Sequence, residues 1–426
     1  MGFFKKASLL VMAVVLLCGL AACGSTASAA EQKSDKPRIT SPQVSEADLA
    51  ALVDGNTAFA LDLYQSLKAK DGNLFYSPYS LSVALAMTYA GARGETEKQM
   101  ADTLHFTLSQ AKLHQAFNGL DGVLASRNQV TGLKEEERFR LNVVNAIWGQ
   151  KGYKFLAEFL DVLAENYGAG MRILDYANAL EESRQTINKW VSDKTENRIN
   201  DLIPQGSIDE MAKLVLTNAI YFNATWVYPF EVKATADGQF KMLDGKSVTV
   251  PVMHQTESLK YAEGSGYQAV ELPYMGNELS MVVLLPATGQ FQAFESSMGS
   301  GMEDIIANLK TTQVTLSLPR FSFESSFELG QTLAAMGMPE AFSMAADFSG
   351  MDGTDQLYIS KVLHKAFVSV DESGTEAAAA SAVVIRTKGM PGDHATMTVD
   401  RPFIFLIRDM TTGTALFVGR VLQINS

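Results

Sequence analysis

Hydrophobic periodicity predicts that folded structure begins near residue 45 with a helix. Ser45 can cap the start of this helix, with Asp48 three residues further on. Leu52, Phe59 and Leu67 then continue one apolar face of the predicted helix. This amphipathic pattern indicates a helix that packs against a core with one side.

A second helix is predicted after Ser77. Pro78 stands at the first helical position, where the missing N–H removes no helix hydrogen bond. Leu81 and Leu85 share an apolar face, and Gly91 ends the helix. The sequence therefore predicts two helices before its first long strand.

The rest of the chain mixes strand and helix patterns. The run 213–222, KLVLTNAIYF, is almost continuously apolar, as expected for a central strand that is buried on both faces. The other predicted segments are a strand at 139–150, an amphipathic helix at 187–200, a hairpin at 270–286 that turns at Gly276-Asn277, and a strand followed by a helix at 318–342. Because the strands are scattered along the chain and no internal repeat occurs, we expect one large α+β domain.

The stretch from Asp371 to Gly392, DESGTEAAAASAVVIRTKGMPG, is ambiguous when only its local preferences are considered. Its four consecutive alanines favour a helix, whereas the β-branched run from Val383 to Ile385 favours extended structure. If the segment is a strand, alternation places Glu376 and Arg386 on one face and leaves the other face without charge. The uncharged face consists of Thr375, Ala377, Ala379, Ser381, Val383 and Ile385.

Composition narrows the class of partner. The 426-residue chain is 47% hydrophobic and 19% charged, which is ordinary for a globular protein with a large core. Its formal net charge is −12, and it contains no block of basic residues, so a nucleic-acid partner is not expected. The expected partner is a protein or a small molecule.

The N-terminus has the features of a targeting segment. Lys5 and Lys6 form a positive region, residues 9–17 form a short apolar region, and Leu20-Ala21-Ala22-Cys23 follows. This last run resembles the lipobox of bacterial lipoproteins, in which the cysteine becomes the lipidated first residue. We therefore expect a signal peptide at residues 1–22 and a lipid anchor on Cys23, with the protein on the outer side of a membrane.

The N-terminal region also allows a second cleavage site, and it ends in a polar segment. Cleavage near Ala29 or Ala30, with plain secretion, is the alternative to lipidation. Cys18 lies inside the removed segment, so a lipidated Cys23 would leave no free thiol. Residues 23–44 are small and polar, contain proline and lack apolar periodicity, which predicts a flexible tether.

No residue is predicted to be catalytic. The five histidines fit no metal-binding spacing, and no nucleophile elbow or phosphate-binding loop occurs. Gly264-Ser265-Gly266 matches part of a dinucleotide fingerprint, but the residues that follow alternate like a strand instead of opening a helix. The sequence therefore predicts neither an enzyme, nor a metal site, nor a cofactor.

Long motifs in a fixed order resemble those of one protein family. Residues 73–100 resemble the N-terminal signature of serpins, the serine protease inhibitor family, and residues 400–421 resemble its C-terminal signature. The resemblance covers residues 45–426 and implies a single-domain α+β serpin fold, with about eight or nine helices around three β-sheets. It also implies an exposed reactive-centre loop at about residues 372–395.

The resemblance implies a suicide-substrate inhibitor. In inhibitory serpins the loop is cut by the target protease and then enters the main sheet as a new strand. This insertion is a well-known case of strand addition to a sheet. Such insertion needs small residues near the hinge, no proline and an uncharged inward face, and Gly374 to Ile385 meets these conditions. The hinge positions implied are Glu372, Gly374, Thr375, Glu376, Ala377, Ala378, Ala379 and Ala380. The alternative is a non-inhibitory serpin that binds or carries a ligand.

Family spacing also implies the reactive bond. It places the scissile residue fourteen positions after the hinge glycine, and Gly374 plus fourteen is Lys388, so the bond is Lys388-Gly389. A lysine there implies a trypsin-like target protease. Arg386 is a second basic alternative, while Thr387 or Met390 would shift the target towards elastase-like or chymotrypsin-like proteases. The protein is expected to be a monomer that can form loop-sheet polymers when heated.

Two further groups of residues are implied by the resemblance. Ser77, Ser80, Asn218 and His364 are expected to form a buried polar cluster where the main sheet parts, although His364 alone also fits a simple core histidine. At the base of the loop, Glu372 is expected to pair with Arg320 near Trp226. The importance of that ion pair depends on its burial, because an exposed pair contributes little.

Overall fold

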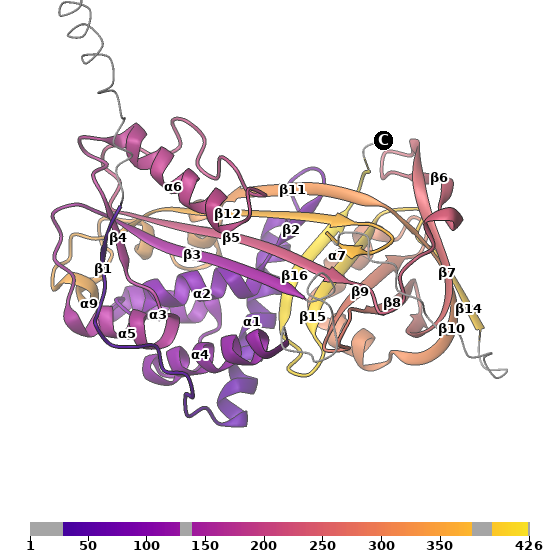
Figure 1. Ribbon diagram of the computed structural model, residues 1–426, viewed down its shortest axis with the longest axis horizontal. Coiled ribbons are helices and arrows are strands. Elements are labelled where there is room, and N and C mark those ends of the chain that lie inside the picture. Colours follow the sequence, from indigo (N-terminus) through magenta and orange to yellow (C-terminus); the bar gives the residue numbers. More distant parts are fainter. Residues whose placement is uncertain (1–28, 128–138, 377–393, 425–426) are drawn as a thin grey trace, which may run out of the picture.

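The computed structural model describes residues 29–127, 139–376 and 394–424, and all structural statements refer to these ranges. They form an elongated α+β body in which most helices lie on one side of a long sheet (Figure 1). The α-helices of this described part are α1 (Glu46–Leu67), α2 (Pro78–Tyr89), α3 (Gly94–Leu104), α4 (Gln110–Ser126), α5 (Ala157–Tyr167), α6 (Leu180–Lys194), α7 (Phe291–Ala307), α8 (Gly330–Met336) and α9 (Ser349–Asp352). The predicted α+β class with a single domain is confirmed.

The first two helices begin as the sequence predicts. The Ser45 side chain accepts a hydrogen bond from the backbone N–H of Asp48 (3.1 Å), and Ser77 caps α2 through the N–H of Ser80 (3.1 Å). The predicted helix at 187–200 is placed too late, because α6 spans Leu180–Lys194. The chain leaves the helix where Glu196 and Asn197 adopt positive φ angles.

A seven-stranded sheet forms the long axis of the molecule (Figure 1). Its strand order is β1 (Ala30–Gln32), β4 (Met171–Leu174), β3 (Arg140–Gln150), β5 (Leu214–Thr225), β13 (Gly374–Thr375), β12 (Ile359–Val370) and β11 (Phe321–Glu328). Helix α6 covers one face, and α2 with its neighbouring helices covers the other. Both faces are therefore shielded from water, which explains the apolar sequence of β5.

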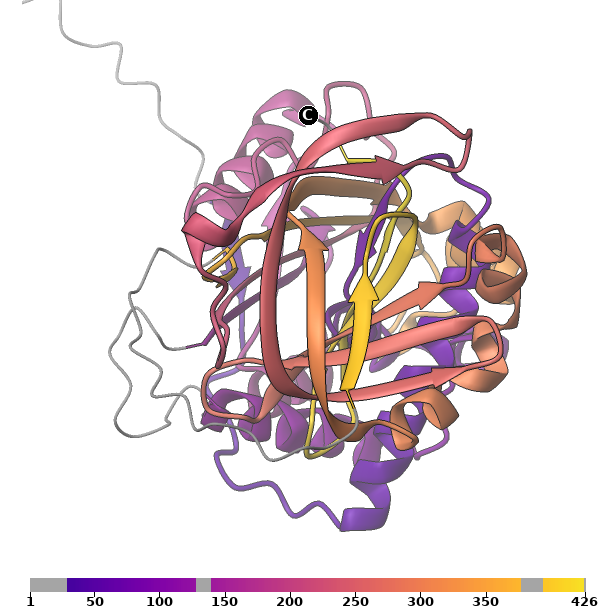
Figure 2. The same cartoon turned by 90° about the vertical axis from the view of Figure 1, so that its right-hand side faces the viewer.

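The remaining strands form a second, strongly bent sheet, which Figure 2 shows from the end of the molecule. Its strand order is β14 (His394–Thr398), β10 (Lys310–Pro319), β7 (Ser247–Gly264), β8 (Tyr267–Pro273), β9 (Leu279–Pro286), β15 (Phe403–Asp409), β16 (Ala415–Val421) and β2 (Leu74–Tyr76), with β6 (Ala236–Lys241) paired to β7. The expected three sheets are thus two hydrogen-bonded sheets in the described residues. The reason is β7, which pairs with β6 over residues 247–252, with β10 over residues 252–261 and with β8 over residues 260–264, and so joins all of these strands into one sheet.

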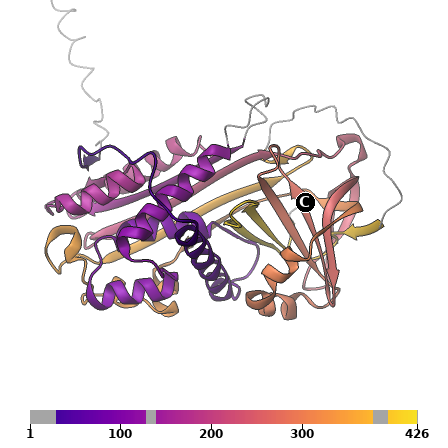
Figure 3. The ribbon, with the colours of Figure 1, turned by 90° about the horizontal axis from the view of Figure 1, so that it is seen from below.

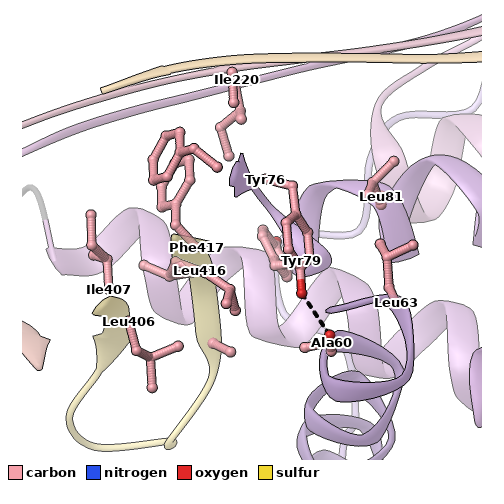
Figure 4. Packing of buried hydrophobic residues seen from close by; sticks show 14 of the residues in the cluster. Ala60, Leu63, Tyr76, Tyr79, Leu81, Ile220, Leu406, Ile407, Leu416 and Phe417 are labelled. Carbon is pink, nitrogen blue, oxygen red and sulfur yellow. Dashed lines mark hydrogen bonds between the residues drawn. The ribbon is translucent and has the colours of Figure 1, made fainter. Parts of the chain in front are cut away.

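The main core lies between the two sheets and the helices beneath them. Figure 4 shows Ile220 of β5, Tyr76 of β2 and Phe417 of β16 converging there with residues of α1 and α2. The buried Tyr76 hydroxyl donates to the carbonyl of Ala60 (2.6 Å), so the phenol is satisfied inside the core. A smaller cluster on the opposite face of the long sheet packs Trp148 and neighbouring residues beneath α6.

The N-terminal segment corrects the tether prediction. Residues 30–32 form β1, which pairs with β4 at the edge of the long sheet, and the chain then runs on to α1 (Figure 3). Lys36 contacts Asp161 and Glu165 of α5 at 2.9 and 3.2 Å, and Arg38 contacts Asp121 of α4 at 2.6 Å. Residues 30–44 are therefore held by edge pairing and ion pairs. These interactions do not require a repeating pattern of apolar residues, so the sequence of the segment resembles a tether. The earlier part of the predicted tether, including Cys23, lies outside the described residues.

Candidate functional site

The site is built along the line between β5 and β12, which we call the seam. These two strands pair in parallel from Ile359 opposite Leu214 to Ala366 opposite Ile220. Beyond Ala366 they no longer pair with each other, and the two residues of β13 lie between them instead. The two strands are thus joined directly along the lower part of the seam, from Ile359 to Ala366 of β12. They are separated by β13 at the upper end of the seam, near Val370.

Thr375 lies with its side chain toward the core, as the alternation pattern predicts. Residues 374 and 375 pair with Thr225 and Ala224 of β5, while Thr375 also pairs with Val370 of β12. The Thr375 hydroxyl lies 2.6 Å from that of Tyr274, and both residues are buried. If the strand continued beyond Thr375, every second residue after it would have its side chain on the same inward face.

Gly374 is required by the close approach of the neighbouring strand. A Cβ atom at this position would lie 2.0 Å from the carbonyl oxygen of Ala224, far inside van der Waals contact. The backbone of Trp226 donates to the carbonyl of Ser373 (2.9 Å), which holds the segment against β5. A larger residue at 374 would therefore push the hinge out of the sheet.

Glu376 lies on the opposite face from Thr375, but that face is covered. Its side chain is only 6% exposed, and Arg198, just after α6, places Nε 2.8 Å from the carboxylate. Burial raises the pKa of Glu376 to about 7, against the lowering effect of Arg198. Glu376 also has a positive φ of 52°, so the hinge turns out of strand conformation directly after Thr375.

The residues expected at the base of the loop do come together. Arg320 donates to Glu372 through Nε (2.8 Å) and Nη2, and the hydroxyl of Thr235 donates to the same carboxylate oxygen. Burial opposes the charged form, but these hydrogen bonds outweigh it and lower the pKa of Glu372. Trp226 donates from Nε1 to the carbonyl of Asp371 (3.1 Å) and stacks on Tyr274. The hinge is therefore fixed from both sides.

The four residues expected in the polar cluster also meet, in the middle of the seam. His364 Nδ1 contacts the side-chain oxygen of Asn218, and Asn218 Nδ2 donates to the hydroxyl of Ser80 (2.6 Å). The backbone N–H of Ser77 donates to His364 Nε2 (3.3 Å). All four residues are fully buried, so each hydrogen bond replaces one that water would otherwise supply.

His364 is neutral in this cluster, and its tautomer follows from its partners. Burial lowers its pKa to about 3. Because Nε2 accepts from Ser77, the proton lies on Nδ1 and is donated to Asn218 across the seam. The hydrogen bond from His364 of β12 to Asn218 of β5 joins the two strands through their side chains. A different acceptor could take the place of Asn218 in this bond.

Asn145 of β3 belongs to the same cluster but was not predicted. Its side-chain oxygen accepts from the Ser80 hydroxyl (3.2 Å) and from Asn218, and its Nδ2 donates to the carbonyl of Ser80 (3.0 Å). The signal was a lone amide within the apolar strand pattern VVNAIW. A polar side chain at an otherwise buried position of a strand needs a partner, and Ser80 and Asn218 supply it.

Several predicted positions lie outside the described residues. These are the reactive bond Lys388-Gly389, hinge residues Ala377, Ala378, Ala379 and Ala380, and the lipidation site Cys23. Within the described ranges, no group of three or more His, Cys, Asp or Glu side chains is placed to hold a metal ion. None of the helices in those ranges is long and apolar enough to cross a membrane.

Comparisons with known proteins agree with this geometry. A family model described as Serpin (serine protease inhibitor) matches residues 54–424. The chain is 39% identical to the human leukocyte elastase inhibitor, over 87% of this chain and 98% of the relative. Its fold is similar to the native state of tengpin, a thermophilic serpin (TM-score 0.81, 30% identity, 93% of this chain and 100% of tengpin). It is also similar to human thyroxine-binding globulin (TM-score 0.78, 30% identity, 89% and 100%).

Proposed function

The chain belongs to the serpin family, and from this premise we propose that it is a suicide-substrate inhibitor of serine proteases and not an enzyme. The observation that carries the proposal is β13, the start of the loop, which already lies between β5 and β12. A loop that has entered the seam at its hinge needs only to lengthen the same strand after it is cut.

The register of β13 supports full insertion. Thr375 opposes Ala224 in an antiparallel pairing, so each step forward on the loop is one step back on β5. Continued in this way, Ser381 would oppose Asn218, and the pairing of Thr375 with Val370 would place the same Ser381 opposite His364. Because Asn218 and His364 oppose each other now, both strands give the same register.

The predicted fate of the polar cluster follows from this register. Ser381 shares the inward face with Thr375, so its hydroxyl would arrive between Asn218 and His364. There it could donate to the amide oxygen and accept from the imidazole, which replaces the bond that the inserting strand breaks. A seam with a polar centre can thus part without leaving buried groups unsatisfied.

The free energy of insertion is large. About ten ladder hydrogen bonds at roughly 1 kcal/mol each, with burial of Val383 and Ile385 at roughly 2 kcal/mol each, amount to a release on the order of 10 kcal/mol or more. The intact form is then held by a kinetic barrier, not by equilibrium. Cutting the loop removes that barrier by freeing one end of the strand.

We further propose that the reactive bond is Lys388-Gly389 and that the target is trypsin-like, because a lysine fits an acidic specificity pocket. The serine of the target attacks the carbonyl carbon of Lys388, the peptide bond breaks, and the Gly389 amine leaves with a proton. Insertion of the loop then carries the acyl-enzyme away from its starting position before water can hydrolyse the ester.

Incubation with trypsin tests the proposal. We expect a covalent complex that survives boiling in detergent, no complex with trypsin whose catalytic serine is replaced by alanine, and loss of trypsin inhibition in the variant Lys388→Ala. A carrier function is the alternative favoured by the likeness to thyroxine-binding globulin. Clean cutting by active trypsin with no complex would exclude inhibition of this enzyme class, and mass spectrometry of the released peptide would identify the cut bond.

We propose also that the protein is lipid-anchored at Cys23 on the outside of the cell. The supporting observation is the LAAC run that follows a short apolar segment. Metabolic labelling with a radioactive fatty acid should label the wild-type protein and not Cys23→Ser. Release of unlabelled wild-type protein into the medium would instead indicate plain secretion.

A further inference from the structure

The described chain begins at the end of the long sheet that lies away from the hinge, which we call the basal end. Figure 1 shows β1, β4 and α9 at this end and β6 at the opposite end. Paired residues of five strands form one row across the sheet at the basal end: Ala30, Ile173, Gly149, Leu214 and Ile359. Ala29, the first described residue, packs against the apolar cluster beneath α6. The place at which the chain enters the domain is therefore fixed.

Large apolar side chains are exposed at the basal end. Five large hydrophobic side chains are exposed among the described residues, and three of them belong here: Leu156 (37%), Met211 (68%) and Met344 (85%). Leu156 donates its N–H to the carbonyl of Met351 in α9 (2.7 Å). Met344 follows Phe342, which lines one cavity together with Met211. The other two exposed side chains flank β6, at the opposite end of the molecule.

The backbone holds Met211 in its exposed position. Its N–H donates to Oδ1 of Asp209 (2.9 Å), and its carbonyl accepts from the hydroxyl of Tyr358 (3.1 Å). The cavity beside it has a volume of about 330 Å³. A single exposed apolar residue is ordinary on a protein surface, whereas a group of them is typical of an interaction surface. The basal end therefore has the apolar part of such a surface.

Tyr153 and Lys213 add an amphipathic pair to the basal end. Lys213 Nζ lies 5.8 Å from the centre of the Tyr153 ring, and Gln32 of β1 donates to the Tyr153 carbonyl (3.4 Å). Tyrosine and lysine each have an apolar body and a polar tip, which suits them to the boundary between water and lipid chains. The pair therefore extends the apolar group with side chains that fit a membrane surface.

Charge does not favour an anionic partner at the basal end. The protein has a formal net charge of −12, and Asp209 and Glu210 stand directly before Met211. Lys151 lies 3.6 Å from Asp175, so part of the positive charge at this end is already compensated. An anionic surface would repel a protein of this charge. The partner that fits the basal end is therefore one without net charge.

We propose that the basal end rests on the membrane surface and places Leu156, Met211 and Met344 among neutral phospholipid head groups. The inference rests on the proposed lipid anchor at Cys23. Six residues lead from Cys23 to Ala29, and a chain of this length reaches at most about 22 Å. The anchor therefore keeps the basal end within reach of the bilayer.

This orientation directs the hinge away from the membrane. Strand β5 runs from Leu214 at the basal end to Thr225, which pairs with Gly374 of the hinge. A strand of this length spans about 36 Å. The target protease would therefore be a soluble enzyme that arrives from the medium, because the active site of a protease seated in the bilayer would lie far below the hinge.

Short-range fluorescence quenching tests the orientation in the lipidated full-length protein. A lipidated Cys23 has no free thiol, so one introduced cysteine can carry a dye. The cysteine is Met211→Cys in one variant and Leu243→Cys, at the opposite end, in the matched control. The vesicles are phosphatidylcholine with or without a nitroxide on the head group. We expect the nitroxide to quench more than about half of the signal at position 211 and less than about a tenth at position 243, equally in about 0.1 M and about 1 M salt.

The outcomes distinguish the anchor from the orientation. Protein that does not float with the vesicles would overturn the proposed anchor and the inference with it. Protein that floats but is quenched equally at positions 211 and 243 would overturn the inference alone. Quenching at position 211 that disappears in high salt would replace the apolar contact by a charge contact. Absence of quenching at position 211, with cross-links between copies at that position, would assign the surface to a second copy of the chain.

A second pair of variants tests whether the apolar side chains make the contact. The dye is placed at the exposed position 154 by Lys154→Cys. Met211→Asp should then lower the nitroxide quenching at least two-fold, because a charged group enters an apolar environment only at a high cost. Leu243→Asp, an equally drastic change at an exposed apolar position, is the control and should leave the quenching unchanged. Undiminished quenching in Met211→Asp would overturn the proposed contact.

Discussion

The two sheets of the molecule are both deeply buried, yet their central strands are joined in different ways. In the bent sheet, every residue of β9 and β16 is buried, and Phe75 stacks on Phe417 with ring centres 4.9 Å apart. In the long sheet, the seam places the polar side chains of Asn218 and His364 at its centre. The two sheets are therefore buried to a similar extent. Apolar rings pack between strands of the bent sheet, whereas hydrogen-bonded polar side chains join the strands at the seam.

This difference indicates which strands can separate. Apolar packing such as that around Phe417 has no equivalent partner to exchange, so separating the strands would lose it entirely. The hydrogen bond between His364 and Asn218 can be replaced by bonds to an inserted hydroxyl. The parallel pairing of β5 with β12 is also slightly weaker per residue than the antiparallel pairing in the bent sheet.

The largest effect is expected at the hinge. Thr375→Arg places a charge on the inward face beside Tyr274, where burial costs several kcal/mol. A cost of that size shifts the balance between inhibition and simple hydrolysis more than a hundred-fold, so the variant should become a substrate. Titration of trypsin against the variant measures this stoichiometry. Thr375→Ser keeps the hydroxyl and is the control; an unchanged stoichiometry in the arginine variant would refute the assigned face.

In the bent sheet, Phe417→Ala should lower the free energy of unfolding by about 3–5 kcal/mol through loss of packing. We expect the same loss in intact and loop-cut protein, because the seam into which the loop is proposed to insert lies in the other sheet. Denaturant titration of both forms provides the measurement. A loss in only one form would show that the bent sheet also rearranges.

At the seam, Asn218→Ala should affect the two forms unequally. In the intact protein it leaves the Nδ1 proton of His364 unpaired and costs about 1–3 kcal/mol. In the cut protein Ser381 would supply the partner, so the loss should be smaller by at least half. Asn188→Ala, a buried amide of α6 bonded to Ile203, is the matched control and should lower both forms alike. Equal losses in the seam variant would argue against the proposed register.

The smallest effect concerns pH. Burial lowers the pKa of His364 to about 3 and of His114 to about 4, so the unfolded chain binds more protons than the folded chain below pH 6.5. Stability should be complete above pH 6.5 and fall by about 1.4 kcal/mol per pH unit for each histidine. Glu376, with its pKa raised to about 7, acts in the opposite direction over the same range.

Denaturant titrations between pH 5 and 6.5 would measure the net slope. The two histidines outweigh the single glutamate, so stability should decrease as the pH falls. His114→Gln should make this decrease smaller, whereas Glu376→Gln should make it steeper. A decrease in His114→Gln as large as in the wild type would contradict the buried, neutral state of that histidine.

Sequence alone predicted the parts of the fold that depend on periodicity and local capping. Ser45 and Pro78 mark helix starts that the structure reproduces, and Gly276-Asn277 marks the turn between β8 and β9. Alternation also predicted the inward side chain of Thr375 correctly. These features depend on short stretches of chain whose physics can be judged without the rest of the molecule.

Features that depend on distant partners were missed. Residues 30–44 are ordered by β4, α4 and α5, and their own composition resembles a tether. The membership of Asn145 in the polar cluster depends on Ser80 and Asn218, far away in sequence. The bulge at Ser360, where β12 has one residue more than β5, is a mismatch between the two strands and has no signature in either strand alone.

Thermal unfolding of the intact and the loop-cut protein tests the central claim that the seam parts to admit the loop. A release of about 10 kcal/mol, divided by an unfolding entropy of about 0.8 kcal/mol per kelvin for a domain of this size, predicts that the cut raises the Tm by about 12 °C or more. An unchanged or lower Tm after a single cut between residues 386 and 390 would contradict the claim.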